Sequence, residues 1–269
     1  MEEYSIGFRM KFDNVEPEDI VKVVTEFLNR FDRYEIKVTN NIISSGKIYV
    51  LLEISERLAS GKYSLHLPKN VLSNAQAYTE TKNLIKMLQH YRSTKIVHLI
   101  MHIPFGSIHK YLKYIFSISM DLPENYVLLL ENEKTDSNNY KYLRQIDELC
   151  ALLCKQEITN VGICLDIGHL LFGAYKEGII QGHCLEQLTK MSCTLSMIKQ
   201  IHIHDYLGRD HLQLGEGIMS LENVSRFIVE NGLMVPIIIE ATVKQPEYDG
   251  VKQISIMAQV LRNIEEMME

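Results

Sequence analysis

The most constraining feature of the sequence is a repeated alternation between short apolar runs and longer amphipathic stretches. Each run holds five to eight residues, which is the length of a strand, and its largely continuous apolar character fits burial on both faces. Strands that alternate with helical stretches are typical of parallel sheets, because a parallel connection must cross over the sheet. The eight predicted strands cover residues 5–10, 34–38, 63–67, 96–103, 126–132, 161–166, 199–204 and 236–241.

The stretches between these strands carry apolar residues at intervals of three and four, which predicts amphipathic helices. The stretch 220–232 shows the expected ends, with Ser220 as a helix N-cap and Gly232 as a stop. Eight strands that alternate with helices favour a (β/α)8 TIM-like barrel of the α/β class, with a doubly wound open sheet as the alternative. The other helical stretches that we predict are 16–31, 74–91, 138–156 and 250–268.

Length and composition indicate one folded domain over residues 1–269, since barrels of this kind are commonly about this size. No linker or low-complexity tract interrupts the pattern. The first ten residues lack the features of a signal peptide, and no apolar run approaches the ~18 residues of a membrane span. The five cysteines have no paired spacing, which favours reduced thiols and a cytoplasmic location.

The balance of charged residues indicates which class of molecule the chain binds. The chain has 28 Lys and Arg against 34 Asp and Glu, a net charge of −6. Nucleic-acid binding depends on Lys and Arg contacts to phosphates, so this balance disfavours a nucleic-acid partner. A local basic rim on the barrel is still compatible with the overall charge. We expect a small-molecule substrate and no membrane partner.

Ligand-type side chains gather at the carboxyl ends of the predicted strands, where TIM barrels place their chemistry. The densest stretch is IHIHDYLGRDHLQLGEG at 201–217, which holds three of the ten histidines. Six of the eight strands deliver a His, Asp or Glu to this rim. The residues concerned are His66, His102, Glu131, Asp166, His202, His204 and Glu240, followed in loops by His169 and His211.

Three of these residues are carboxylates that end apolar strands: Glu131, Asp166 and Glu240. Brought together at neutral pH, they would repel one another. A divalent cation removes the conflict, because its charge inverts the local electrostatics. Carboxylates combined with imidazoles suit Mn, Zn, Fe or Co better than Ca, so the sequence predicts a metal site.

The alternation of side chains between the two faces of a strand separates the histidines that can reach the barrel mouth from those that cannot. His202 and His204 lie two residues apart and share a face, so both can point into the barrel mouth. His98 shares a face with His102 but lies about 13 Å lower, at ~3.3 Å per residue, and is predicted to be a core residue. Three further histidines have no partners in the sequence and are predicted to lie at the surface: His90, His109 and His183.

At these residues the chain resembles the xylose-isomerase-like barrels. This superfamily includes the sugar phosphate isomerases and epimerases, the ketose 3-epimerases and the zinc-dependent abasic-site endonucleases. The matching motifs occur in the family's order and span most of the C-terminal half, with two earlier pieces. They are LLENE, CLDIGH, HIHDYLGRDHLQLGEG and IIIEAT, preceded by SLHLP and MHIP.

The resemblance to the sugar epimerases implies one divalent ion (Mn, Zn, Co, Fe or Mg) held by four residues. These ligands would be Glu131, Asp166, His202 and Glu240. Glu131 and Glu240 would also act as an acid/base pair, one removing the proton beside a carbonyl and the other returning a proton on the opposite face. The leading hypothesis is therefore a metal-dependent isomerase or epimerase in carbohydrate metabolism that acts on a sugar or sugar phosphate.

The alternative is a zinc-dependent phosphodiesterase similar to the abasic-site endonucleases, which carry three zinc ions. His66, His102, His169 and His211 resemble members of that larger ligand set. An Asp is expected there two residues before the last His, but this chain has Arg209 in that place. A ligand-binding barrel without turnover is a third hypothesis, which the intact acid/base pair disfavours. Related barrels often pair, so a homo-oligomer stays open.

In small-molecule members of the superfamily, the extra histidines can bind substrate instead of a further metal. The residues open to either role here are His66, His102, His169, His204 and His211. Arg209 can grip a phosphate or carboxylate through two parallel hydrogen bonds, with a solvated loop charge as the equal alternative. Gly215 and Gly217 are predicted to shape their loop, and Glu216 to be structural.

Overall fold

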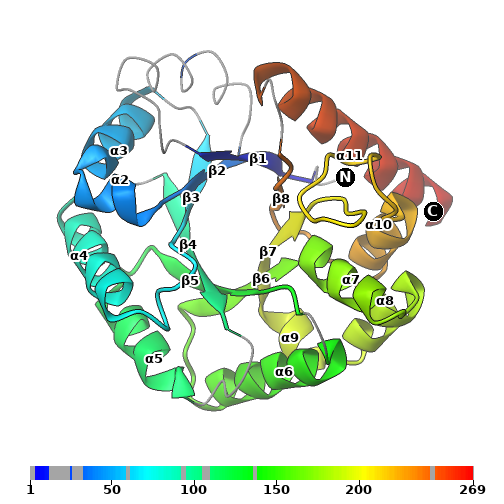
Figure 1. The fold of residues 1–269 in the computed structure, drawn as a ribbon, viewed down its shortest axis with the longest axis horizontal. Helices are drawn as coiled ribbons and strands as arrows, with labels where there is room; N and C mark the ends of the chain where they lie inside the picture. Colours follow the sequence, from blue (N-terminus) through cyan, green and yellow to red (C-terminus); the bar gives the residue numbers. More distant parts are fainter. Residues whose placement is uncertain are drawn as a thin grey trace.

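The computed structural model of the chain describes residues 4–11, 25, 33–58, 61–91, 95–104, 110–135, 138–242 and 246–268. Eight parallel strands close into a barrel in sequence order, with β8 paired to β1 (Figure 1). This confirms the predicted TIM-like barrel and excludes the open sheet. The strands are β1 (Ile6–Lys11), β2 (Arg33–Lys37), β3 (Lys62–His66), β4 (Ile96–Ile103), β5 (Val127–Asn132), β6 (Val161–Asp166), β7 (Ile198–Ile203) and β8 (Ile237–Ile239).

Helices surround the barrel as an outer ring (Figure 1). Four predicted helical stretches are present, and the fifth, 16–31, lies outside the described residues. Two connections hold more helices than a simple alternation, since α2 and α3 lie between β2 and β3, and α7, α8 and α9 lie between β6 and β7. The described helices are α2 (Asn40–Ser44), α3 (Lys47–Leu58), α4 (Ala75–Tyr91), α5 (Leu112–Asp121), α6 (Asn139–Lys155), α7 (Ile167–Lys176), α8 (Gln181–Thr189), α9 (Ser192–Met197), α10 (Leu221–Glu230) and α11 (Pro246–Met268).

The limits of α10 follow the predicted capping. The Ser220 hydroxyl accepts a hydrogen bond from the Asn223 N–H at 3.2 Å, which satisfies one of the donors that a helix start leaves open. Gly232 follows the helix with a φ of 60°, a left-handed conformation that glycine adopts without strain.

The strands separate two environments. Side chains on their outer faces, such as Leu128 and Leu130, join the large core beneath the helices. Inside the barrel, Ile100, Leu129 and Cys164 form a separate small apolar cluster. Polar side chains also lie inside the barrel, and they leave the carboxyl end of the strands lined with charged and imidazole groups.

The segment after β7 is folded around the buried Asp205 side chain. One carboxylate oxygen accepts from the backbone N–H groups of Tyr206 (2.8 Å) and Met219 (2.9 Å). The other accepts from Gly215 (3.0 Å) and Gly217 (2.9 Å). A Cβ at Gly217 would overlap the Asp205 carboxylate, so the predicted loop-shaping role of these glycines is confirmed.

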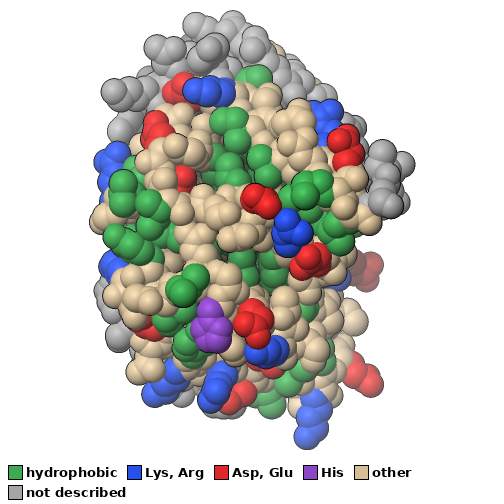
Figure 2. Space-filling model, turned by 90° about the vertical axis from the view of Figure 1, so that its right-hand side faces the viewer, with side chains coloured by type: hydrophobic (Ala, Val, Ile, Leu, Met, Phe, Trp, Pro, Cys, Tyr) green, Lys and Arg blue, Asp and Glu red, His purple; other side chains and the backbone are tan. Residues whose placement is uncertain are grey.

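The remaining composition-based expectations concern the thiols and the surface. All five cysteines are free. No helix among the described residues combines the length and the apolar character needed to cross a bilayer. On the face seen in Figure 2, acidic and basic side chains are interspersed rather than separated into large blocks of one sign.

Candidate functional site

The four residues that the sequence predicts as metal ligands meet at the carboxyl end of the barrel. Glu131, Asp166, His202 and Glu240 end strands β5 to β8 and are at most 2% exposed. Each offers one ligand-type atom within 4.8 Å of those of the other three. Closure of the barrel thus brings together side chains that are far apart in the sequence.

Glu131 lies at the centre of this cluster, and both of its carboxylate oxygens are engaged. Oε2 lies 2.9 Å from His66 Nε2 and 3.2 Å from His102 Nε2. Oε1 lies 2.8 Å from His202 Nδ1. Glu131 therefore belongs to two ligand groups, the four residues above and a second group formed with His66 and His102.

The contacts of the two His66 ring nitrogens fit a cation bound between His66 and Glu131. Its Nδ1 lies 3.1 Å from the carbonyl oxygen of Leu67, to which an Nδ1–H donates. The Nε2 lone pair then faces the Glu131 carboxylate, and two acceptor atoms 2.9 Å apart repel unless a proton or cation lies between them. Two ligand atoms that are each about 2.1 Å from one ion lie about 3 Å apart, so the observed spacing fits a shared ion.

Unpaired buried atoms support the same conclusion. Buried polar atoms in proteins nearly always have a hydrogen-bond partner. Several atoms around this cluster have none among the described residues, although they lie close to one another, and this arrangement fits bound cations. The atoms are His102 Nε2, Asp166 Oδ2, His169 Nε2, His204 Nε2 and Glu240 Oε2.

Two buried charged residues of the site were missed by the sequence analysis. Arg9, on β1, makes an ion pair with Glu240, and its side chain is 7% exposed. Glu35, on β2, places Oε2 2.9 Å from His202 Nε2. Both interrupt apolar strands that are covered on two sides, and a charge at such a position must point into the barrel. This pattern could have identified them.

The buried charges do not balance. Four carboxylates, Glu35, Glu131, Asp166 and Glu240, and one guanidinium, Arg9, leave an excess of three negative charges when the histidines are neutral. An excess of this size in a buried site favours the binding of divalent cations.

The carboxyl groups stay ionised despite their burial. Burial by itself raises a carboxyl pKa, but the neighbouring imidazoles and the Arg9 guanidinium outweigh it here. His102 is the largest of the opposing influences on Glu131, and Arg9 on Glu240, and the pKa of each carboxyl lies well below its usual range. The pKa of Asp166 is lowered mainly by His169. All three are therefore available as anionic ligands at neutral pH.

Asp166 is held by its surroundings on both sides. Its Oδ1 accepts from the His169 N–H at 2.7 Å and so caps α7. The Asn132 side chain receives the Asp166 N–H at 2.8 Å and donates to its carbonyl oxygen at 2.9 Å. This double contact fixes the end of β6 relative to β5.

A third group consists of His169, His204 and His211. The ring Nδ1 of His169 lies 3.4 Å from the Asn132 carbonyl oxygen, and that of His211 lies 3.0 Å from the Glu240 carbonyl oxygen. Each Nδ1 therefore donates, and each Nε2 keeps its lone pair for a ligand. His204 differs, because its Nδ1 receives the His211 N–H at 3.0 Å and also lies 3.2 Å from the Asp205 carbonyl oxygen, while its Nε2 lies 3.4 Å from Asp166 Oδ1.

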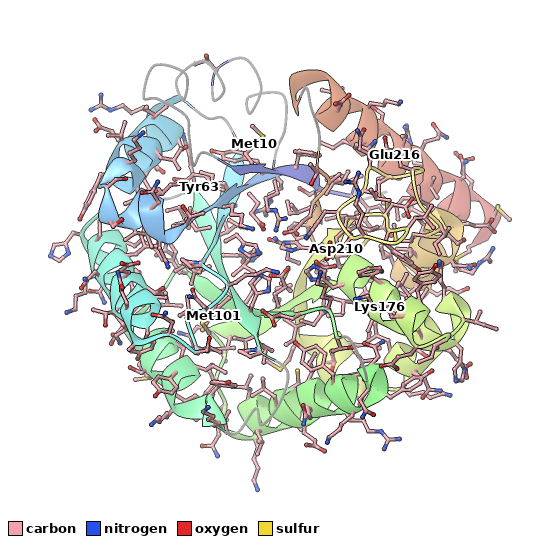
Figure 3. All side chains as sticks on the ribbon, in the orientation of Figure 1. Met10, Tyr63, Met101, Lys176, Asp210 and Glu216 are labelled. Carbon is pink, nitrogen blue, oxygen red and sulfur yellow. The ribbon has the colours of Figure 1, made fainter. Side chains whose placement is uncertain are left out.

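At position 209, where the resemblance to the endonucleases leads us to expect an Asp, the chain has Arg209, but the neighbouring Asp210 approaches the third group in the structure. Arg209 is exposed, whereas Asp210 places Oδ2 3.9 Å from His169 Nε2 and pairs with Lys134 at 2.9 Å. Figure 3 shows Asp210 toward the barrel centre and Glu216, which is exposed, farther out. An acidic group thus lies beside the third group from a neighbouring sequence position.

The other histidines lie as expected where the structure describes them. His98, predicted to be a core residue, is half-buried and hydrogen-bonds Gln200 Oε1 at 2.9 Å on the inner face of the barrel. His90 and His183 are exposed, and His109 lies outside the described residues.

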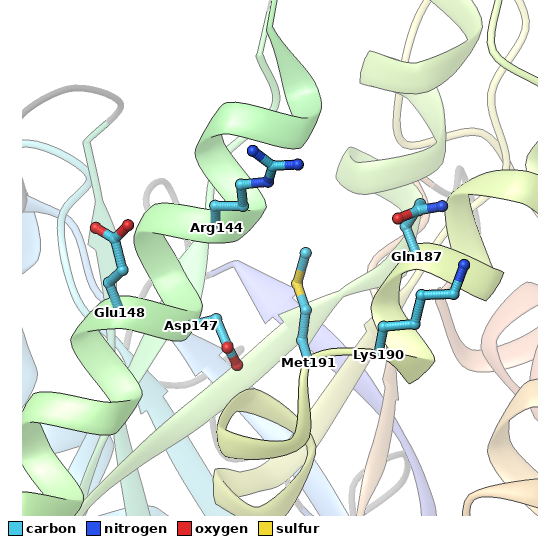
Figure 4. A pocket seen from close by; sticks show the side chains of 6 residues that line it. All are labelled: Arg144, Asp147, Glu148, Gln187, Lys190 and Met191. Carbon is cyan, nitrogen blue, oxygen red and sulfur yellow. The ribbon is translucent and has the colours of Figure 1, made fainter.

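A separate groove lies on the outer ring, between α6 and the segment α8–α9 (Figure 4). Its acidic residue Asp147 already accepts hydrogen bonds from the N–H (2.9 Å) and hydroxyl (2.8 Å) of Thr194. None of the residues that line this groove belongs to the ligand groups at the barrel mouth.

Fold and site together define a parallel TIM barrel with buried carboxylate and imidazole groups that fit divalent cations. A family model described as a xylose isomerase-like TIM barrel matches residues 112–264, more than half of the chain. The chain therefore belongs to the xylose isomerase-like TIM barrel family. No curated protein is significantly similar in sequence.

Solved structures with this fold include both functional branches. A D-tagatose 3-epimerase-like protein is 18% identical, with a TM-score of 0.64 over 98% of this chain and 100% of that chain. Endonuclease IV from Thermus thermophilus is 15% identical, with a TM-score of 0.65 over 96% and 99%. A xylose isomerase-like TIM barrel protein from Mycobacterium smegmatis, in complex with magnesium, is 12% identical, with a TM-score of 0.67 over 98% and 99%. At these identities the likeness shows the fold.

Proposed function

We propose that this chain is a divalent-metal-dependent hydrolase of phosphate esters, with cations bound on both sides of Glu131. The observation that carries this proposal is the engagement of both Glu131 oxygens, by His66 Nε2 at 2.9 Å and by His202 Nδ1 at 2.8 Å. A carboxylate shared by two ligand groups acts as a bridge. Paired cations suit phosphoryl chemistry, because they stabilise both the attacking and the leaving oxygen.

The residues divide between two cation positions. His66, His102 and Glu131 form one, and Glu131 with Asp166, His202 and Glu240 forms the other. The mixture of imidazole and carboxylate suits Zn, Mn, Co or Fe. Cations there supply Lewis-acid activation of the phosphoryl group and of water.

The charge of the site supports two cations over one. One divalent ion leaves the excess of three negative charges at minus one, which repels a phosphate. Two ions reverse it to plus one, which attracts an anionic substrate. His169 and His211 face the same mouth with Nε2 lone pairs, so they either hold a third cation or accept hydrogen bonds from substrate hydroxyls.

Charge also narrows the substrate class. The net charge of −6 and the interspersed charges of Figure 2 disfavour a long polyanion. We therefore propose a small phosphate ester or phosphodiester as substrate. Cleavage of DNA at abasic sites is the outcome that would instead assign the chain to the abasic-site endonucleases, which its sequence motifs also resemble.

The second candidate is the metal-dependent sugar isomerase or epimerase. It is favoured by the position of Glu131 and Glu240, whose Oε1 atoms lie 2.8 and 3.0 Å from the same His202 Nδ1. Two carboxylates around one point form an acid/base pair if a single cation binds between them. This candidate needs a free oxygen on Glu131, whereas a bridging Glu131 has none.

Metal counting and two activity assays separate these candidates. We expect at least two ions per chain by elemental analysis and metal-dependent hydrolysis of aryl phosphomonoesters or phosphodiesters. A nicking assay on abasic-site DNA tests the nucleic-acid substrate. One ion per chain, together with deuterium uptake from solvent into a keto sugar, would establish the epimerase instead.

A further inference from the structure

We propose that Glu35 is a positioning residue that makes His202 a metal ligand. Its carboxylate accepts the proton on His202 Nε2, which leaves the lone pair of Nδ1 directed at the cation position. The inference rests on the proposed metal site, and it assigns a role to a carboxylate that the ligand groups of the two-cation site do not include.

The geometry places the two sides of one imidazole in different environments. On one side, Nε2 lies 2.9 Å from Glu35 Oε2. On the other, Nδ1 lies 2.8 Å from Glu131 Oε1 and 3.0 Å from Glu240 Oε1. The opposite tautomer would direct a lone pair at the Glu35 carboxylate and an N–H at the cation. Glu35 therefore disfavours the tautomer that cannot bind metal.

Glu35 is itself oriented by Gln200. The amide Nε2 of Gln200 donates to Glu35 Oε2 at 2.9 Å. Its Oε1 accepts from Ser64 Oγ and from His98 Nδ1, each at 2.9 Å. A flipped amide would place its oxygen against the Glu35 carboxylate, so the network fixes one orientation. This buried network extends from His98 inside the barrel to His202 at the mouth.

One close contact constrains the hydrogen positions. Gln200 Nε2 also lies 2.8 Å from His202 Nε2. If His202 carries a proton on Nε2, both nitrogens are donors, and each must direct its hydrogen at the shared Glu35 oxygen. Both measured distances to that oxygen, 2.9 Å from each nitrogen, allow this.

A deeper cation is the competing explanation. Glu35 forms a fourth group of ligand-type atoms with His66, His202 and Glu240, and Glu35 Oε1 has no hydrogen-bond partner among the described residues. A cation on the Glu35 side of His202 would face the N–H of Gln200, which repels it. We therefore prefer the positioning role, and the ion count distinguishes the two.

The test compares Zn²⁺ affinity in wild type, Glu35→Gln and Glu35→Leu by competition with a chromophoric chelator. Glu35→Leu removes the acceptor, and we expect a 10–100-fold loss of affinity. Glu35→Gln keeps one acceptor oxygen and should recover part of it. Thr194→Val is the matched control, because it loses the buried hydrogen bond from the Thr194 hydroxyl to Asp147 on the outer ring, away from the ligand groups, and its affinity should stay within about twofold.

Folding is monitored by circular dichroism and thermal unfolding of the metal-free variants. The Co²⁺-loaded proteins give an independent readout, because a change in the ligand field of His202 alters the absorption spectrum. If the Glu35 variants do not fold, ¹⁵N-histidine NMR on the Zn²⁺-loaded wild type still decides. We expect His202 Nε2 to be protonated and Nδ1 to be metal-bound.

Three results would overturn the inference: wild-type affinity in Glu35→Leu, an unprotonated Nε2 on His202, or loss of one whole ion from the Glu35 variants while the others bind normally. The last result would establish the deeper cation site. A wild-type chain that binds no divalent cation would instead overturn the proposed function itself, so the two failures are distinguishable.

Discussion

The backbone N–H of His211 donates to the ring Nδ1 of His204 at 3.0 Å. The other ring nitrogen of His204, Nε2, lies 3.4 Å from Asp166 Oδ1. His211 adopts a left-handed φ of 57°, which is unusual for a residue other than glycine. The strained backbone thus holds the His204 ring beside Asp166 and presents His211 at the mouth as a potential ligand.

The space occupied by His204 predicts the effect of Gly168→Ala. A Cβ at Gly168, in the first turn of α7, would lie 2.5 Å from His204 Nε2, whose ring is fully buried. We expect a loss of about 1–3 kcal/mol in the free energy of unfolding, and reduced activity because the His204 ring is displaced from Asp166. Denaturant unfolding and turnover measure the two effects.

Gly182→Ala is the matched control for this substitution. Gly182 lies in α8, and nothing is within 4 Å of a Cβ added there. Alanine favours a helix over glycine by up to about 1 kcal/mol, so stability should be unchanged or slightly higher. Equal destabilisation by both substitutions would mean that His204 is not the cause.

The shared position of Glu131 predicts the outcome of Glu131→Gln. If Glu131 bridges two cations, an amide at this position should reduce the number of ions bound and lower turnover by at least about a hundredfold. If it is only an acid/base group at a single ion, the ion count should stay the same while activity is lost. Elemental analysis of the dialysed variant therefore separates the two proposed functions.

Glu133→Gln is the control for Glu131. Its side chain is 27% exposed and lies at the rim, 3.8 Å from His102 Nδ1. We expect the ion count to match wild type. A loss of ions in this variant would show that charge anywhere on the rim, rather than the bridging geometry, governs binding.

Removal of metal should weaken the fold. Without cations, the excess negative charge at the barrel mouth is uncompensated. A cation present at 100 times its dissociation constant stabilises the folded state by about 2.7 kcal/mol. We expect a chelator to lower the unfolding temperature and one of Zn, Mn, Co, Fe or Mg to restore it. The proposed site fails if none of these ions has an effect.

The burial of His98 predicts a pH dependence of stability. Burial lowers the pKa of His98 from 6.5 to about 4, although its hydrogen bond to Gln200 opposes the shift. Between these values the unfolded chain binds a proton that the folded chain does not, so stability falls as the pH decreases from about 6.5 to about 4. The full effect of this group is at most about 3 kcal/mol.

His98→Gln tests this assignment, since glutamine can donate to Gln200 but does not titrate. Urea unfolding at pH 7, 5.5 and 4.5 should give a shallower decrease in stability for the variant than for wild type. Parallel pH curves for the two proteins would attribute the acid sensitivity to other groups.

The fold was predictable because its pattern is local. Each of the eight strands was identified from a short apolar run, and 96–103 and 161–166 agree with the observed bounds of β4 and β6. The meeting of Glu131, Asp166, His202 and Glu240 was also predictable, since the carboxyl ends of parallel strands share one end of a barrel.

The sequence alone therefore determined the barrel and the set of side chains that reach its mouth, because strand periodicity and strand ends are properties of short segments. Only the tertiary structure decided how their atoms pair. The sharing of Glu131, the contact between His204 and Asp166, and the contact between Glu35 and His202, 167 positions apart, all depend on how the closed barrel aligns distant strands. Such alignment arises from packing across the whole sheet, and no single segment encodes it.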